Sequence, residues 1–295
     1  MKITKVDEVQ ISGNSLVTVT RMNHILEVQH MEKKNNKCHI VKLDSDRYVE
    51  IATGEIKDFL KTENRSQGLN SLRQTFKKVR YLINNNFTGS PNELFTTLTY
   101  EEQTNDHLQV GTDYKNFLKR LKYEYRELTT IDALKVLEPH ASGNYHMHVL
   151  LRFNDLEQVY IPNEKLAEIW GLGFVTVQSL KGVDNVGAYL SAYMADIEVP
   201  DDFSSQHEDL EEKMVNGKKK KFIKGGRLAF YPTGVNLYSK TKGIIYPLRE
   251  DMSYFEAKKI AGAATPHYKK SLLIADEEKD FSNTITYEQY NLKRT

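Results

Sequence analysis

A single cysteine, no long apolar run and almost no net charge are the first features of this 295-residue chain. Cys38 alone cannot close a disulfide within the chain, so a reduced, cytoplasmic setting is expected. No stretch approaches the ~18 apolar residues that a membrane-spanning helix needs. The segment Met1 to Gln10 lacks the apolar core of a signal peptide. We therefore expect a soluble protein with no membrane partner.

The charges nearly cancel, with 41 basic against 40 acidic residues and a net charge of +1. Global charge therefore does not indicate nucleic-acid binding, and any such function has to rest on local basic segments. A glycine-rich phosphate-binding loop that ends in Lys-Ser or Lys-Thr is also absent, which argues against a built-in helicase.

Changes in residue pattern divide the chain into four predicted segments. Residues 1–65 hold short alternating stretches and form a small β-rich N-terminal module. Residues 66–200 form the main domain, which opens with a basic helix over 66–86. Residues 201–225 are acidic and then basic, and we interpret them as an exposed charged loop. Residues 226–295 form a C-terminal extension that packs on the core.

The main domain shows a regular succession of elements. Apolar spacing predicts strands over 94–100, 131–137, 146–153 and 173–180, and helices over 114–126, 162–170 and 183–195. This β-α-β-β-α-β-α order predicts an α+β fold, with a ferredoxin-like or split β-α-β antiparallel sheet and helices on one face.

Two histidines separated by one apolar residue, His146-Met147-His148, open the strand predicted over 146–153. Side chains alternate along a strand, so both imidazoles point to one face and Met147 points to the other. Two imidazoles on one face of a rigid strand form half of a metal site. Alone, such a pair more often lines the polar face of a half-exposed strand, and further ligands have to decide.

Glu138 is the best candidate for the third ligand, because a hairpin through residues 141–144 would bring it beside the two histidines. His140 competes for this role but falls in the turn. Two imidazoles and one carboxylate suit Mn²⁺ or Mg²⁺, and Zn²⁺, Co²⁺ or Ni²⁺ in vitro.

Tyr189 and Tyr193 lie four residues apart in the helix predicted over 183–195, so both hydroxyls project from one helical face. Tyrosine is among the residues that form covalent intermediates. Attack on phosphorus would displace a 3′-oxygen, leave a 5′-phosphotyrosine and conserve the diester energy for rejoining. The alternative is that both rings pack in the core. Beside the metal motif, the pair predicts a DNA-nicking enzyme.

In order and spacing these motifs resemble those of the HUH endonucleases, specifically the rolling-circle replication initiators of Gram-positive plasmids, phages and integrative elements. Three motifs carry the resemblance over residues 91–197: Phe95–Tyr100, Glu138 with His146-Met147-His148, and Tyr189–Tyr193. The stretch from Gly226 to Gly243 also looks like the continuation found in these initiators.

The resemblance implies that His146, His148 and Glu138 bind the metal and that Tyr189 or Tyr193 is the nucleophile. Tyr189 is favoured because single-tyrosine relatives align with it. The resemblance also implies nicking of single-stranded or hairpin origin DNA, rejoining at termination, and a host helicase and polymerase as partners. It leaves the oligomeric state open. Many members carry a lysine three residues after the tyrosine; Ala192 and Asp196 stand there in this chain.

Local basic and aromatic residues are candidates for DNA contacts, although lysines on helices also serve solubility and most aromatic rings are core. The candidates for phosphate contacts are Arg73, Lys77, Lys78, Arg80, Lys119, Arg120, Lys219 and Lys220, and those for stacking on unpaired bases are Tyr100, Tyr145, Phe174 and Tyr231.

Three alternative functions remain. A conjugative mobilisation relaxase would nick a transfer origin, but its tyrosine usually precedes the histidines. A non-enzymatic origin-binding regulator would be favoured by loss of Glu138 or of both tyrosines, and none is lost. A cupin-type oxygenase also uses His-x-His with a glutamate, but there the glutamate follows within a few residues.

Overall fold

The computed structural model describes residues 2–34, 38–59, 69–139, 144–195, 197–199, 210–215, 218–223, 230–231, 235–276 and 280–294. The chain divides into two compact units. The first contains residues 1–21, 25–63 and 249–295, and the second contains residues 22–24 and 64–248. No helix in the described part of the chain combines the length and apolarity needed to cross a membrane.

The first unit is built on a six-stranded sheet with the order β1-β16-β17-β3-β2-β15. Alternating residues of its strands pack against helix α5, which begins with a capping box of Ser253 and Glu256. The elements are β1 (Lys2–Val6), β2 (Leu16–Met22), β3 (Ile25–Met31), β15 (Leu248–Ser253), α5 (Tyr254–Ala261), β16 (Pro266–Asp276) and β17 (Phe281–Asn291). A second, three-stranded sheet joins β4 (Ile40–Lys42), β5 (Arg47–Glu50) and β6 (Ile56–Asp58).

The ends of the chain share this unit, which differs from the predicted division. The N-terminal module is β-rich as expected, but β16 pairs with β1 and β17 pairs with β3. From residue 249 on, the predicted C-terminal extension therefore completes the N-terminal module instead of packing on the main domain. Strand pairing between distant segments leaves no trace in local residue patterns, and for this reason the prediction missed it.

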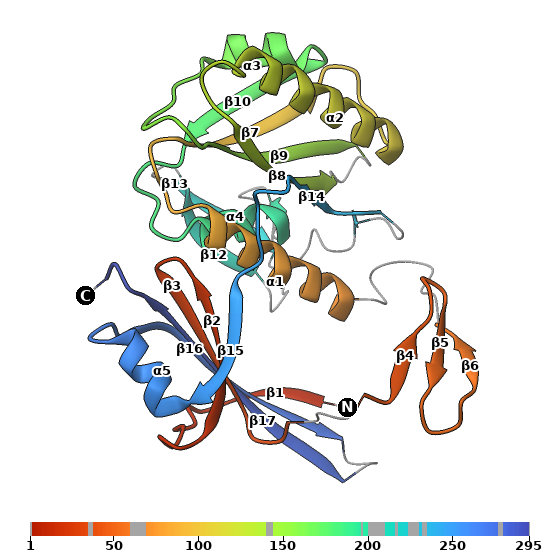
Figure 1. The fold of residues 1–295 in the computed structure, drawn as a ribbon, viewed down its shortest axis with the longest axis vertical. Coiled ribbons are helices and arrows are strands. Elements are labelled where there is room, and N and C mark those ends of the chain that lie inside the picture. The colour runs from red at the N-terminus through yellow and green to blue at the C-terminus, as the bar shows by residue number, and fades with distance from the viewer. Residues whose placement is uncertain are drawn as a thin grey trace. The chain divides into compact units, whose positions relative to one another are not determined.

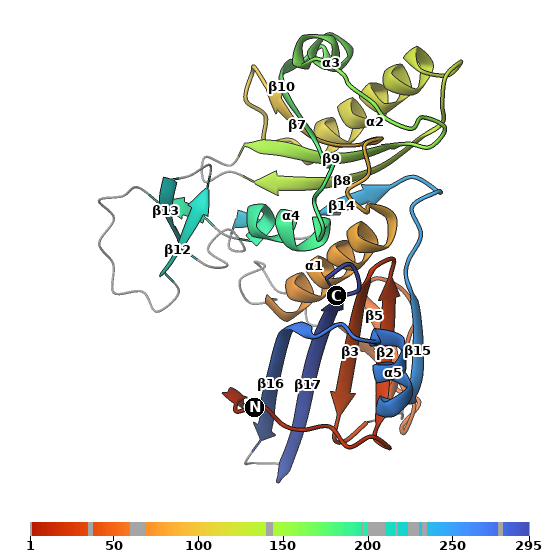
Figure 2. The same cartoon turned by 90° about the vertical axis from the view of Figure 1, so that its left-hand side faces the viewer.

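The second unit contains a five-stranded antiparallel sheet with the order β10-β7-β9-β8-β14 (Figures 1 and 2). Its elements are α1 (Leu69–Asn86), β7 (Glu93–Tyr100), α2 (His107–Glu124), β8 (Ile131–Pro139), β9 (Tyr145–Phe153), α3 (Asn163–Trp170), β10 (Gly173–Ser179), α4 (Val186–Ala195) and β14 (Tyr238–Lys240). The predicted β-α-β-β-α-β-α succession is the observed one. The first four strands lie in the order fourth-first-third-second, which is the ferredoxin-like arrangement.

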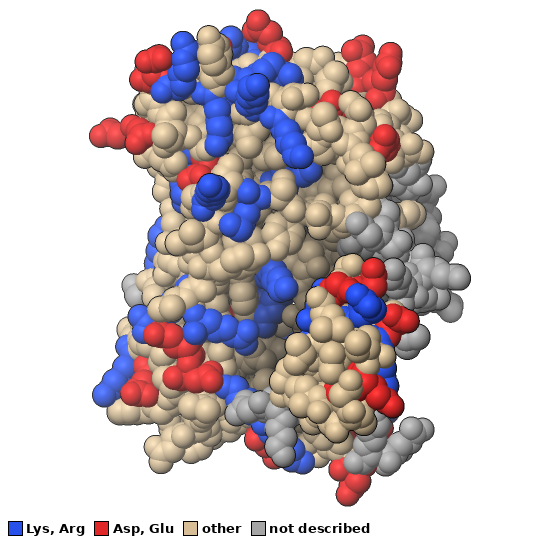
Figure 3. Space-filling model, turned by 45° about the vertical axis from the view of Figure 1, so that its right-hand side comes forward, with Lys and Arg blue, Asp and Glu red and all other residues tan. Residues whose placement is uncertain are grey.

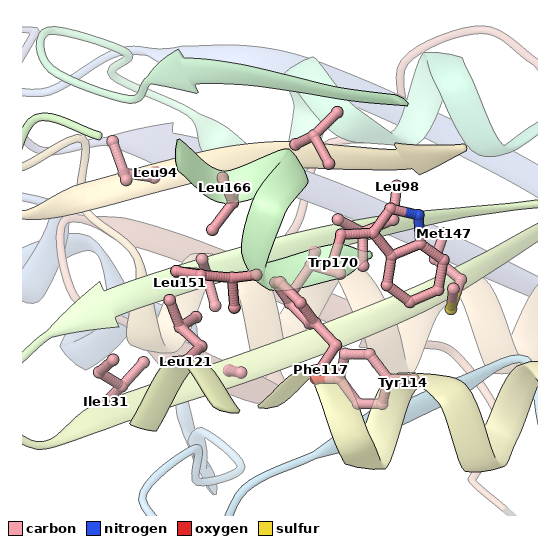
Figure 4. Packing of buried hydrophobic residues seen from close by; sticks show 14 of the residues in the cluster. Leu94, Leu98, Tyr114, Phe117, Leu121, Ile131, Met147, Leu151, Leu166 and Trp170 are labelled. Carbon is pink, nitrogen blue, oxygen red and sulfur yellow. The ribbon is translucent and has the colours of Figure 1, made fainter. Parts of the chain in front are cut away.

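Helices cover both faces of this sheet, whereas the sequence predicted them on one. Helices α2 and α3 lie on one side of the sheet and α1 and α4 on the other (Figures 1 and 2). Figure 4 shows the core under α2 and α3, where Phe117 and Trp170 meet Met147 and Leu151 of β9. The opposite core joins Phe95, Val136 and Leu150 of the sheet to Val79, Leu82 and Ile83 of α1 and Val186 and Leu190 of α4.

The charged segment predicted as a loop contains regular structure. Strands β12 (Leu210–Val215) and β13 (Lys218–Ile223) form an antiparallel hairpin, and β11 (Ile197–Val199) adds to β13. Glu212 lies opposite Lys221 across the hairpin. Opposite charges face each other across the two strands at this pair, which offsets the repulsion within the lysine run.

A buried polar cluster fixes the loop after β14 to the edge of the sheet and yields a stability prediction. Asp132 accepts hydrogen bonds from Thr241 Oγ1 at 2.7 Å and Arg152 Nη2 at 3.0 Å. A Cβ on Gly243 would lie 2.2 Å from Asp132 Oδ2. Gly243→Ala therefore has to displace a carboxylate that two donors hold, and we expect a loss of about 1–3 kcal/mol in the free energy of unfolding.

The measurement is urea unfolding followed by the fluorescence of Trp170, the chain's one tryptophan, which is buried in the second unit. Gly111→Ala in α2 is the matched control, because its Cβ would meet nothing within 4 Å. Alanine is the better helix former, so we expect the control to gain up to about 1 kcal/mol. Equal midpoints for the two variants would contradict the assigned role of Gly243.

Candidate metal and tyrosine site

The register between β8 and β9 sets the geometry of the candidate site. Glu138 pairs with His146 and Val136 pairs with His148. Because paired residues share a face and successive residues alternate, both histidines and Glu138 lie on the same face of the sheet. This is the face on which α1 and α4 pack, and we call it the histidine face. Met147 points the other way, into the core under α2 and α3.

His148 is held on three sides. Its Nε2 hydrogen-bonds to Oε2 of Glu138, and its Nδ1 shares a hydrogen bond of 3.1 Å with the hydroxyl of Thr97 on β7. Its ring stacks on Phe95, with 5.3 Å between centroids and 21° between the planes. His148 and Glu138 are both buried. The ring is therefore fixed in orientation, as a metal-ligating imidazole requires.

His146 lies one step along β9 from this pair and is partly exposed. Among the described residues, no group of three or more His, Cys, Asp or Glu side chains lies close enough together to hold a metal ion. The structure thus brings Glu138 and His148 into contact, while His146 is opposite Glu138 but outside that contact. The competing ligand, His140, lies outside the described residues.

Helix α4 carries the two tyrosines, and its first turn is anchored to α1. Asn84 Oδ1 accepts a hydrogen bond of 2.7 Å from the amide of Gly187, and Asn185 Oδ1 accepts one of 3.0 Å from Ala188. A Cβ at Gly187 would lie 2.5 Å from Asn84 Oδ1, so only glycine allows this approach. Side-chain acceptors at the start of a helix satisfy amides that have no partner within it.

Tyr189 is 39% exposed, and its hydroxyl donates to Gln178 Oε1 on β10 at 3.3 Å. Gln178 pairs with Phe95, whose ring stacks on His148. The Tyr189 hydroxyl therefore lies on the histidine face, about two strand spacings, or roughly 10 Å, to the side of β9. Tyr193 belongs to the same helix, but its side chain lies outside the described part of the structure.

Sequence reasoning did not single out Thr97, Gln178 or Asn84. Thr97 could have been found, because alternation along β7 places it on the face of any ligand from the neighbouring strand. The contacts of Gln178 and Asn84 join segments distant in sequence, so no local pattern announces them. The predicted turn at residues 88–92 contains a similar case, since its amides clamp the buried carboxylate of Glu93.

The basic candidates for DNA contacts are divided between the two faces of the sheet. Arg73, Lys77, Lys78 and Arg80 belong to α1 on the histidine face, and Lys77 and Arg80 both lie over the Tyr81 ring. Lys119 and Arg120 belong to α2 on the opposite face. Figure 3 shows Lys and Arg side chains gathered on that side of the second unit, with acidic ones among them.

Three candidates have structural partners. The guanidinium of Arg120 donates to the carbonyls of Ile169 and Trp170, each at 2.7 Å, and so caps the end of α3. Tyr100 contacts Trp170 and donates to Asp113 at 2.9 Å, and burial together with this bond raises its pKa. Lys219, in β13, lies 3.7 Å from Glu212. The side chain of Lys220 lies outside the described part.

Comparison with known proteins places a name beside this geometry. Residues 93–198 match a family model described as replication-associated protein, of the ORF2 type. The match runs from β7 to the end of β11 and includes Glu138, His146, His148, Tyr189 and Tyr193. No curated protein and no solved structure matches the chain. The match supports a replication-associated role for this chain and a replication initiator as the protein type.

The anchor between α1 and α4 leads to a prediction about the tyrosine helix. Asn84→Ala removes the acceptor of the Gly187 amide, and we expect a loss of about 1–2 kcal/mol with faster opening of the first turn of α4. Hydrogen exchange of the α4 amides measures this directly. Asn85→Ala, one position away and partly exposed, serves as control. Equal exchange in α4 for both variants would show that Asn84 does not anchor the helix.

Proposed function

We propose that this protein is a rolling-circle replication initiator of the HUH type, which nicks origin DNA with a tyrosine and later rejoins the strands. The observation that carries the proposal is the contact of His148 with Glu138, with the ring oriented by Thr97, on the same sheet face as the hydroxyl of Tyr189. The family match over residues 93–198 supports the replication part of the proposal.

The donor set fits a divalent metal ion. Glu138 and His148 already meet through an oxygen and a nitrogen that both serve as metal ligands, and His146 lies opposite Glu138 on the same face. Nitrogen and carboxylate donors suit Mn²⁺, and Mg²⁺ with more water. We propose that these three side chains hold the ion, with Zn²⁺, Co²⁺ or Ni²⁺ as substitutes in vitro. When bound, it would act as a Lewis acid toward the scissile phosphate.

The chain's own residues supply the nucleophile and its placement. The phenolic oxygen of Tyr189 forms a bond to phosphorus as the bond to the 3′-oxygen breaks, which leaves a 5′-phosphotyrosine and a 3′-hydroxyl. The phenolic proton leaves to solvent, and the departing oxygen takes up a proton. Gln178 holds the Tyr189 hydroxyl on the histidine face before attack. Tyr193 is the candidate for the second cleavage, and strand separation falls to a host helicase.

The nucleophile assignment predicts a covalent DNA adduct. Incubation with Mn²⁺ and a random-sequence single-stranded DNA library should give a protein–DNA band that survives denaturing electrophoresis and disappears with EDTA. We expect the Tyr189→Phe, Tyr193→Phe double variant to lose adduct by on the order of a thousandfold or more, because both nucleophiles are gone. Sequencing the captured DNA would give the origin sequence.

Tyr238→Phe is the matched control for this experiment. Tyr238 is a partly exposed tyrosine on β14 that pairs with Val136, beside His148 on the histidine face. It should form adduct at the wild-type level. Adduct that persists in the double variant, or that is lost in Tyr238→Phe, would refute the assignment.

The role of Thr97 predicts a change in metal affinity. Thr97→Val keeps the size and the strand preference of the side chain but removes the hydroxyl that orients His148, so we expect Mn²⁺ to bind about tenfold or more weakly. Isothermal titration calorimetry of the two proteins measures this. Thr176→Val is the control, because Thr176 pairs with Thr97 on β10 and is exposed. Unchanged affinity in Thr97→Val would contradict the orienting role.

A further inference from the structure

Phe174 is 65% exposed at the start of β10. β10 forms one edge of the five-stranded sheet. A single exposed ring on a protein surface usually needs no explanation. The position of this one in the register of the sheet gives it significance.

Phe174 pairs with Thr99 on β7. Thr99 lies two residues along β7 from Thr97, which pairs with His148, so the same register carries Thr99 beside His146. His146 pairs with Glu138. Phe174 therefore lies on the histidine face, in the transverse row that contains His146 and Glu138, about two strand spacings or roughly 10 Å from β9.

The backbone at this point fixes where the ring emerges. Gly173 precedes Phe174 and has a φ of +143°, and a Cβ there would lie 2.5 Å from the carbonyl oxygen of Thr99. Only glycine allows the two strands this approach. The start of β10 is thus tightly set against β7, and the direction of Phe174 is set with it.

The histidine face of β10 is exposed along its length. Thr176 and Gln178 follow Phe174 on this face and are both exposed. Gln178 accepts the hydroxyl of Tyr189, four residues or roughly 13 Å from Phe174. The ring and the candidate nucleophile thus lie toward opposite ends of one open strip, which runs past the row of His148.

We propose that Phe174 stacks on an unpaired base of the single-stranded DNA substrate, a few nucleotides from the scissile phosphate and on the side away from Tyr189. This inference rests on the proposed function, because that function makes single-stranded DNA the occupant of the strip. Stacking suits the position, since every base presents an aromatic face. Glu101 and Glu102, exposed beside the end of β7, make a phosphate contact at this point unfavourable.

Phe174→Trp supplies the direct test. The indole can stack as the phenyl ring does, and the protein's own Trp170 is buried and gives a steady background. We expect random-sequence single-stranded DNA to quench the fluorescence of Phe174→Trp in the presence of EDTA. Tyr160→Trp is the control, because Tyr160 is 86% exposed in the loop after the far end of β9. Equal quenching in both variants, or none in Phe174→Trp, would overturn the proposal.

Affinity gives the second readout, from the anisotropy of labelled single-stranded DNA in EDTA. We expect Phe174→Ala to bind about five- to a hundredfold more weakly and Phe174→Tyr to bind like the wild type. The loss should persist at high salt, because stacking does not depend on counterion release. Tyr160→Ala should bind like the wild type. Unchanged affinity in Phe174→Ala, or failure of the wild type to bind single strands, would overturn the proposal.

These outcomes separate the two proposals. A wild type that forms the Mn²⁺-dependent adduct, with unchanged binding in Phe174→Ala, would leave the nicking function standing and remove the stacking role. Loss of binding in Phe174→Ala without any adduct would do the reverse. Fluorescence of Phe174→Trp that changes with protein concentration in the absence of DNA would show a second copy on the strip and would count against stacking.

Discussion

The pairing of β8 with β9 is the constraint on which the candidate site depends. A shift of one residue in β9 would turn both histidines into the core and bring Met147 to the histidine face. Met147, Val149 and Leu151 prevent that shift, because each is buried under α2 and α3. The apolar side chains of β9 thus decide where its imidazoles point. The hydrogen bonds of His148 to Glu138 and Thr97 can form only after this packing has fixed the register.

Two helices on the histidine face shape the site by covering only part of it. Toward the end of β9 the face is apolar, and Leu150 packs with residues of α1 and α4. Toward its start His146 is partly exposed, and across the sheet Phe174 and Thr176 are exposed. His148 lies at the transition. A ligand approaching from the open end would meet polar and aromatic side chains on a support that the apolar end holds rigid.

The sequence was a good guide wherever the signal was local. Alternation and helical spacing predicted the seven elements from β7 to α4 in order, and α5 was anticipated at residues 254–261. The two-residue spacing of His146 and His148 was enough to place them on one face. Contacts between distant segments were beyond reach: the pairing of β1 with β16, the packing of α1 and α4 on the second face, and the hydrogen bond between Asn84 and Gly187. Local pattern also gave no reason to expect Glu138 to contact His148 diagonally instead of His146, the residue directly opposite. That choice follows from the rotamers that Phe95 and Thr97 allow.

Two tyrosines with described side chains lie on the histidine face near His148, and their surroundings separate them. Tyr238 pairs with Val136, in the row of His148, and its hydroxyl is 2.8 Å from that of Tyr246. Burial, together with the Tyr246 hydroxyl, raises the pKa of Tyr238 to about 12. A phenol that ionises with such difficulty is a poor nucleophile near neutral pH. Tyr189 is more open to solvent, and its hydroxyl donates to a neutral amide oxygen that an incoming phosphate can replace. Proximity to His148 alone would leave the choice between them open, and the environment of each hydroxyl favours Tyr189.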